Sequence, residues 1–178
     1  MPKFRKNQMT HQPHTQAETY DAIIEISARS QPVKYEHDHS QGRLRVDRFV
    51  ATSMMYPCNY GYLPNTKGED GDEVDVLVMT PYPLLPGVVI KVRAVGMLAM
   101  TDDGGTDHKI LCVPVSKLTP LYDGVAQPED LPQVILKEIE HFFIHYKDLE
   151  QGKWTKIDGW ERADVAQKII SHAISEYS

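Results

Sequence analysis

Cysteine is scarce in this sequence. Only Cys58 and Cys112 occur among the 178 residues, 54 positions apart and with no C-x-x-C pair. Zinc ribbons and disulfide scaffolds need more cysteines at closer spacing, so neither kind of protein is indicated. Two isolated thiols fit a reducing compartment, and we expect a cytoplasmic location.

Long apolar runs are also absent. No stretch approaches the roughly 18 apolar residues that a membrane helix needs, so we expect no membrane partner. The basic N-terminal residues Lys3, Arg5 and Lys6 precede polar sequence, not the apolar segment of a signal peptide. Residues 1–16 contain two prolines and show no hydrophobic period, which predicts a flexible arm. Residues 17–178 are of ordinary length for one domain.

Positive charge is in deficit. Lysine and arginine number 19 against 25 acidic residues, for a net charge of -6. A negative protein repels a phosphate backbone at long range, so we expect no nucleic-acid partner. The excess is local, because residues 69–75 hold five carboxylates in seven positions.

The pattern of apolar residues predicts a mainly β protein with helices, of the α+β class. Strand-like segments rich in Val, Ile and Leu lie at 20–26, 43–50, 74–79, 88–99 and 109–115. Five short strands between turns favour a small barrel or sandwich. Helical spacing appears only later, from Leu131 to Leu149 and from Ala166 to Tyr177. We therefore predict a closed five-stranded β-barrel, with two helices in the C-terminal half and the first helix packed on the barrel.

Two acidic turns form the strongest functional signal. Asp70, Asp72 and Asp75 lead into one predicted strand, and a second turn runs from Asp102 to Asp107 between two others. Crowded carboxylates repel one another, and a hard divalent cation relieves that repulsion. If the turns meet, Asp70, Asp75, Asp102 and Asp107 would make an oxygen-only site for more than one ion. Such donors favour magnesium or manganese over zinc. Two solvated surface turns are the alternative.

Some cationic and aromatic residues break the apolar pattern. Strand alternation places Arg48 on the same face as the apolar residues Leu44 and Val46. A guanidinium on an apolar face either binds an anion such as phosphate or reaches water at the end of the strand. Lys34 and Glu36 share a face and fit an ordinary surface ion pair. The aromatic residues are Tyr56, Tyr60 and Tyr62. Their side chains fit either packing in the core or donation of a phenolic O–H to a phosphate oxygen.

Other functions compete for the same residues. Asp70-Gly-Asp-Glu-Val74 matches the D-x-D-x-T/V of phosphatases that form an aspartyl-phosphate, but the apolar strand follows the aspartates instead of preceding them. His141 and His145 have i,i+4 spacing without the glutamate of a zinc protease helix, which indicates surface or subunit-contact histidines. An oligonucleotide-binding barrel that stacks bases on the tyrosines and a calcium-binding structural protein remain as non-enzyme alternatives.

Several motifs together resemble one family, the soluble family I inorganic pyrophosphatases. Its aspartate-rich signature is similar to Asp70-Gly-Asp-Glu-Val-Asp-Val76. Further blocks resemble Val46-Asp-Arg-Phe49, Tyr56-Pro-Cys-Asn-Tyr-Gly-Tyr62, Thr80-Pro-Tyr-Pro83 and His145-Tyr-Lys-Asp-Leu149. The similarity spans roughly residues 17–175 in order. It implies an OB-like barrel, a bacterial-type homohexamer built as a dimer of trimers, and hydrolysis of pyrophosphate to two phosphates.

The resemblance also implies a role for each matching residue. Several Mg²⁺ ions, or Mn²⁺ or another divalent ion, would activate the attacking water. The implied metal ligands are Asp70, Asp75, Asp102, Asp107 and Glu36. The implied groups for binding pyrophosphate and phosphate are Lys34, Arg48, Tyr60, Lys109, Tyr146 and Lys147. Asp72 matches the general base, and further site-lining positions are Glu25, Tyr56 and Asp103.

Two positions depart from the family pattern. Asp103 stands where glutamate is common, which shortens a carboxylate near the implied metal site. Ser27 stands where proline is common, and we expect this change to do no more than loosen a turn.

Overall fold

The computed structural model describes residues 18–178, so the predicted N-terminal arm lies outside the described residues. Its main sheet closes on itself through five strands: β1 (Tyr20–Ile26), β4 (Asn59–Leu63), β5 (Val74–Val78), β8 (Lys109–Pro114) and β6 (Val89–Asp102). Each strand pairs with the next in this order, and β6 pairs back with β1. All these pairings are antiparallel except β5 with β8. The predicted five-stranded ring is therefore confirmed.

One member of the ring differs from the prediction. The segment predicted at 43–50 forms β3 (Arg43–Phe49), which pairs only with β2 (Val33–Asp38) in a separate hairpin. Its place is taken by β4, which was not among the predicted strands. β4 is buried along its whole length and so shows no alternation of apolar and polar residues. Two further strands extend the sheet along β6: β7 (Gly105–Thr106) and β9 (Thr155–Arg162).

A β-bulge in the hairpin overturns the predicted face of Arg48. Lys34 pairs with Arg48 while the next residue, Tyr35, pairs with Val46, so Asp47 is the extra residue. The insertion shifts the alternation and places Arg48 on the opposite face from Val46. Arg48 thereby shares the face of Lys34 and Glu36, and Val46 is left half exposed.

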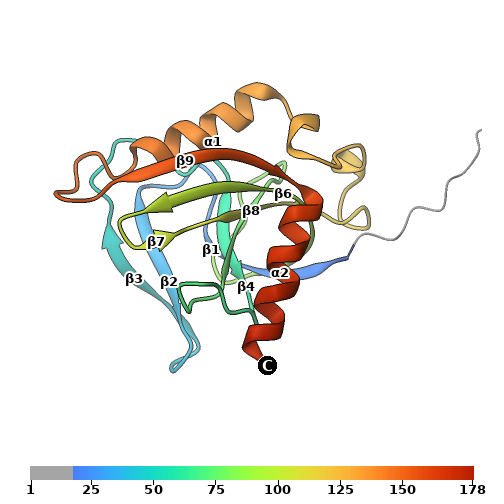
Figure 1. Ribbon diagram of the computed structural model, residues 1–178, viewed down its shortest axis with the longest axis horizontal. Coiled ribbons are helices and arrows are strands. Elements are labelled where there is room, and N and C mark those ends of the chain that lie inside the picture. Colours follow the sequence, from blue (N-terminus) through green and yellow to red (C-terminus); the bar gives the residue numbers. More distant parts are fainter. Residues whose placement is uncertain (1–17) are drawn as a thin grey trace, which may run out of the picture.

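The two helices cover different parts of the barrel (Figure 1). Helix α1 (Gln133–His145) lies along β9 and buries Leu136, Ile139 and Phe142 in the core that also holds Tyr56 and Tyr60. It begins two residues later than the predicted 131–149, after a 3-10 turn, Pro128–Asp130, in which Asp130 accepts two backbone N–H groups, and it ends four residues earlier, at His145. Helix α2 (Ala163–Tyr177) packs on the sheet through Ala166, Ile170 and Ala173. Between β8 and α1 lies another 3-10 turn, Pro120–Tyr122.

Among residues 18–178, no helix combines the length and the apolar character required to cross a membrane.

Candidate active site

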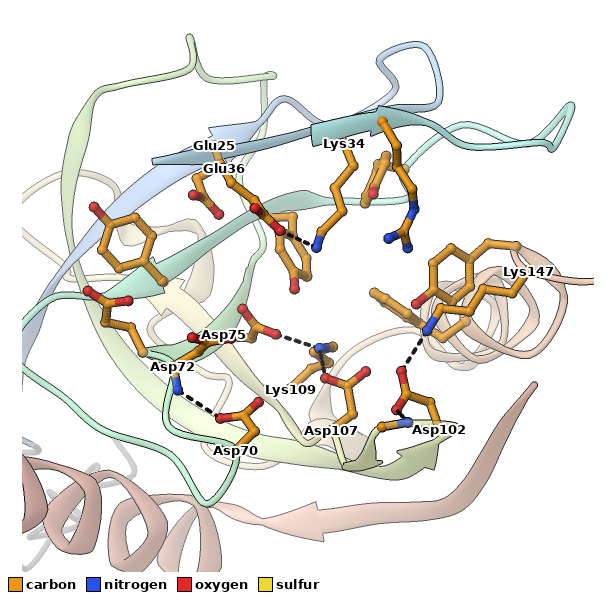
Figure 2. Close-up of a pocket in the computed structure, with 18 of the residues that line it drawn as sticks. Glu25, Lys34, Glu36, Asp70, Asp72, Asp75, Asp102, Asp107, Lys109 and Lys147 are labelled. Atoms are coloured by element: carbon orange, nitrogen blue, oxygen red, sulfur yellow. Dashed lines mark hydrogen bonds and ion pairs between the residues drawn. The ribbon is translucent and has the colours of Figure 1, made fainter. Parts of the chain in front are cut away.

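All the side chains that the sequence singled out as site residues line one cavity of about 420 Å³ (Figure 2). The cavity lies between the β2–β3 hairpin, the acidic loop before β5, the β6–β8 turn and the end of α1. The lining residues of the prediction are Glu25, Lys34, Glu36, Arg48, Tyr56, Tyr60, Asp70, Asp72, Asp75, Asp102, Asp103, Asp107, Lys109, Tyr146 and Lys147. The two acidic turns therefore meet, although they are far apart in the sequence.

Lys109 joins the two turns. Its Nζ lies 2.5 Å from Asp75 Oδ2 and 2.5 Å from Asp107 Oδ1, and the side chain is 3% exposed. Burial by itself would lower the pKa of Lys109, but the carboxylates of Asp75 and Asp107 outweigh it and raise the pKa above its ordinary value. The ammonium group also lies 5.6 Å from the centre of the Tyr60 ring. Lys109 is thus a buried cation between two carboxylates.

Lys147 repeats this arrangement at the second turn. Its Nζ lies 2.6 Å from Asp102 Oδ2, and the side chain is 7% exposed. Burial raises the pKa of Asp102, but the hydrogen bonds from Lys147 and from the Gly104 N–H lower it below its ordinary value. Asp103 is paired with Lys153, whose hydrogen bond lowers the pKa of the Asp103 carboxyl.

On the hairpin side, the cavity is lined by a mixed cluster of charges. Lys34 Nζ lies 2.5 Å from Glu36 Oε1, so the predicted pair exists, and 3.6 Å from Asp47 Oδ2. Arg48 Nε lies 3.9 Å from Glu150 Oε1, and both of these buried atoms lack a hydrogen bond. Arg48 Nη1 donates to Asp47 Oδ2 at 3.5 Å, which leaves the other N–H groups of the guanidinium with capacity to donate to a further anion.

Asp72 lies among other carboxylates on the acidic loop. Its backbone N–H donates to Asp70 Oδ1 at 3.1 Å, which fixes the turn. Burial, followed by the charges of Asp70, Glu73 and Asp75, raises the pKa of the Asp72 carboxyl. Asp72 therefore holds a proton more readily than an ordinary aspartate does.

Glu25 is buried beside the hairpin and accepts the His37 backbone N–H at Oε1, at 2.7 Å. Burial raises its pKa from 4.5 to about 7, although the His37 hydrogen bond acts in the opposite direction. Between these two pH values the folded protein therefore keeps a proton on Glu25 that the unfolded chain releases. The stability that this proton contributes is fully present below pH 4.5 and is lost as the pH rises through about 7.

Replacing Glu25 with glutamine should remove that pH dependence. As the pH rises from 4.5 to 8, the free energy of unfolding of the wild type should fall by about 3 kcal/mol more than that of Glu25→Gln, which follows from the size of the pKa shift of Glu25. Urea unfolding at several pH values without added metal measures this difference. Parallel stability profiles of the two proteins would show that Glu25 does not titrate in this range.

The donor set fits a hard divalent cation. The carboxylates are the oxygen ligands that Mg²⁺ prefers, with no thiolate at the cavity. Within residues 18–178, no three His, Cys, Asp or Glu side chains are grouped closely enough to hold a metal ion as they lie. Lys109 and Lys147 explain this spacing, because their ammonium groups occupy positions among the carboxylates.

Tyr62, which the sequence offered for packing or for donation to phosphate, lines the cavity as well. Sequence reasoning missed several other lining residues: His37, His39, Glu73, Phe143 and Lys153. Glu73 could have been found, since it lies within the acidic run. His37 belongs to β2, which was not predicted as a strand, and His39 follows directly after that strand. Lys153 has no local signal, because its contact with Asp103 spans 50 residues.

Known proteins resemble this chain over most of its length. The family model for inorganic pyrophosphatase matches residues 22–178. An inorganic pyrophosphatase of Yersinia pestis is 59% identical over 148 residues, 83% of this chain and 85% of that protein. One from Agrobacterium fabrum is 54% identical over 157 residues, 88% and 89% of the two chains. The solved structure of an inorganic pyrophosphatase from Coxiella burnetii has a TM-score of 0.88 and 46% identity, covering 91% of this chain and 96% of that one.

The barrel and its cavity of interleaved carboxylates and cationic groups, together with these likenesses, define a hydrolase of a phosphoric anhydride. The chain belongs to the inorganic pyrophosphatase family, so the resemblance found in its motifs is confirmed. An enzyme is therefore favoured over the oligonucleotide-binding and calcium-binding alternatives.

Proposed function

We propose that this chain hydrolyses pyrophosphate to two phosphates by direct attack of water on phosphorus, without a phosphoenzyme. The observation that carries the proposal is the enclosure of cationic side chains and two acidic turns in one cavity. The cationic side chains proposed to hold the substrate are Lys34, Arg48, Lys109 and Lys147. A polyanionic substrate needs cationic groups to hold it and anionic groups to position the counter-ions that screen it.

The cationic groups bind the substrate in this proposal. Lys109 and Lys147 are almost fully buried, so water screens their charges less than it screens those of surface lysines. The planar guanidinium of Arg48 suits bidentate contact with a phosphate. Tyr60 and Tyr146 add phenolic O–H groups at the cavity wall.

Mg²⁺ is the proposed cofactor, with Mn²⁺ or another divalent ion as a substitute. Its proposed ligands are Asp70, Asp75, Asp102, Asp107 and Glu36. When bound, such ions neutralise substrate charge and lower the pKa of water. Lys109 and Lys147 keep the carboxylates of the two turns paired in the structure described here.

Asp72 is the proposed general base. It stands between the proposed ligands Asp70 and Asp75, within the same cavity wall. Its carboxylate accepts the proton that the attacking water loses. Glu25, Tyr56 and Asp103 complete the wall without a direct chemical step.

We also propose an assembly and a cellular location for the protein. A homohexamer, built as a dimer of trimers, is supported by large apolar side chains that lie exposed, such as Phe49, Tyr82 and Leu85. Two free, buried cysteines, Cys58 and Cys112, support a cytoplasmic location. We also propose that residues 17–178 act as a single domain.

Hydrolysis in oxygen-18 water tests the reaction and the attack of water on phosphorus, and a search for a covalent intermediate tests the route. We expect phosphate release that needs Mg²⁺ and stops with excess chelator, with one labelled oxygen entering the phosphate product per bond cleaved. Mass spectrometry of phosphate from a single turnover measures the label. Trapping a covalent aspartyl-phosphate would overturn direct attack, and a lack of pyrophosphate hydrolysis in Mg²⁺ or Mn²⁺ would overturn the function.

A further inference from the structure

Two imidazole rings lie together at the cavity wall without a role in the proposed reaction. His37 is in β2, and His39 follows one residue after the strand ends at Asp38. Residues i and i+2 of an extended chain point to the same side, which brings the rings together. His37 Nδ1 lies 3.4 Å from His39 Nδ1, and the ring centroids are 4.9 Å apart.

This separation suits one metal ion between the two nitrogens. Zinc binds imidazole nitrogen at about 2.0–2.1 Å, and two such bonds at a tetrahedral angle span about 3.4 Å. Packing against Tyr62 holds both rings, with centroid distances of 6.0 Å for His37 and 5.8 Å for His39. The pair is therefore supported from one side and already at the spacing of a chelate.

Glu73 sets the tautomer of His39. Its Oε1 lies 2.9 Å from His39 Nε2, where the ring N–H can donate to the carboxylate. A neutral imidazole protonated at Nε2 has its lone pair on Nδ1, the atom that faces His37. A carboxylate on the far nitrogen of a histidine is the usual support of a metal-binding imidazole.

We propose that His37 and His39 form a binding site for a divalent transition-metal ion, with Zn²⁺ as its probe and Glu73 as the positioning residue. Imidazole donors favour Zn²⁺, Ni²⁺ and Cu²⁺ over Mg²⁺, so the site differs in kind from the carboxylate turns. Across residues 18–178 no third His, Cys, Asp or Glu completes a group here, and the His39 side chain is 57% exposed. Water fills the other coordination positions, and the ion exchanges readily.

The site connects two parts of the cavity wall. β2 carries Lys34 and Glu36, while Glu73 follows Asp72 on the acidic loop. An ion on the two imidazoles strengthens the His39–Glu73 contact, because it makes the Nε2–H a better donor. The hairpin and the acidic loop are thereby held together.

Isothermal titration of the full chain with Zn²⁺, in the presence of saturating Mg²⁺, tests the site. Mg²⁺ occupies the hard oxygen donors, so zinc that binds to imidazoles is measured over a reduced background. We expect His37→Ala and His39→Gln each to lose the same single zinc equivalent. Glu73→Gln should keep the equivalent but bind it about 10-fold or more weakly, the usual scale for a lost supporting carboxylate.

The matched control is the double variant His141→Ala/His145→Ala. It removes the other histidine pair, whose ring centroids are 4.8 Å apart on α1, and it should retain the equivalent that depends on His37. His39 is well exposed, so its variant is expected to fold even if the His37 variant does not. Equal zinc stoichiometry and affinity in His39→Gln and the wild type would overturn the proposal, whether or not pyrophosphate is hydrolysed.

Discussion

Replacing Asp72 with asparagine should lower the turnover of pyrophosphate at neutral pH by about 100-fold or more, the usual scale for losing a general base. The amide keeps the size of the side chain, and the backbone N–H that donates to Asp70 is unchanged. The substitution removes the ability to accept a proton together with one negative charge. Wild-type turnover should fall as acid protonates the Asp72 carboxyl, because the protonated group cannot accept the proton of the attacking water.

The decisive measurement for Asp72 is a pH profile of kcat at saturating Mg²⁺. The wild type should show an acidic limb that Asp72→Asn lacks. Glu69→Gln is the matched control, since it removes one negative charge from the same loop at an exposed residue that does not line the main cavity. It should change kcat little. Near-normal turnover of Asp72→Asn with the wild-type profile would assign the base to another group.

The sequence predicted the candidate site better than it predicted the sheet. The carboxylates are dense in two turns, and turn residues leave a local signal of Asp and Gly at the ends of apolar strands. The structure brings Asp70, Asp75, Asp102 and Asp107 to one cavity. The roles of these residues rest on the family resemblance and remain predictions.

Which strands form the five-stranded ring could not be predicted from short segments of the sequence. β3 has the composition of a barrel strand, yet its pairing with β2 leaves it outside the ring. β4 carries Gly61, where an added Cβ would collide with the Ile23 carbonyl, so the ring closes only with glycine at this point. A bulge at Asp47 cannot be located from alternation, because one extra residue reverses the face of everything after it.

The lysines between the carboxylates are a second feature hidden from the sequence. Lys109 was expected to bind phosphate, but its contact with Asp75 spans 34 residues and had no local signal. It explains how crowded carboxylates can be folded without a metal ion, because Lys109 is shared by the two acidic turns and Lys147 adds a second buried ammonium group at the later turn. Charge balance in the cavity is therefore a property of the fold as well as of the bound ions.

Replacing Lys109 with methionine should destabilise the metal-free protein by about 3–5 kcal/mol, the usual effect of removing one partner of a buried ion pair. Methionine fills the volume of the lysine stem, so the loss reports mainly the missing charge. Asp75 and Asp107 are then left facing each other without a counter-ion. Acid should recover part of the loss, because protonation relieves the mutual repulsion of the two carboxylates.

Urea unfolding at fixed protein concentration, with and without Mg²⁺, separates these effects. Mg²⁺ should restore more stability to Lys109→Met than to the wild type, since a cation that binds only the folded state stabilises it. Lys156→Met is the matched control, because Lys156 pairs with Asp158 while 67% exposed, and surface pairs contribute about 1 kcal/mol or less. A Lys109→Met protein as stable as the wild type, with the same response to Mg²⁺, would contradict the view that this lysine neutralises the two acidic turns.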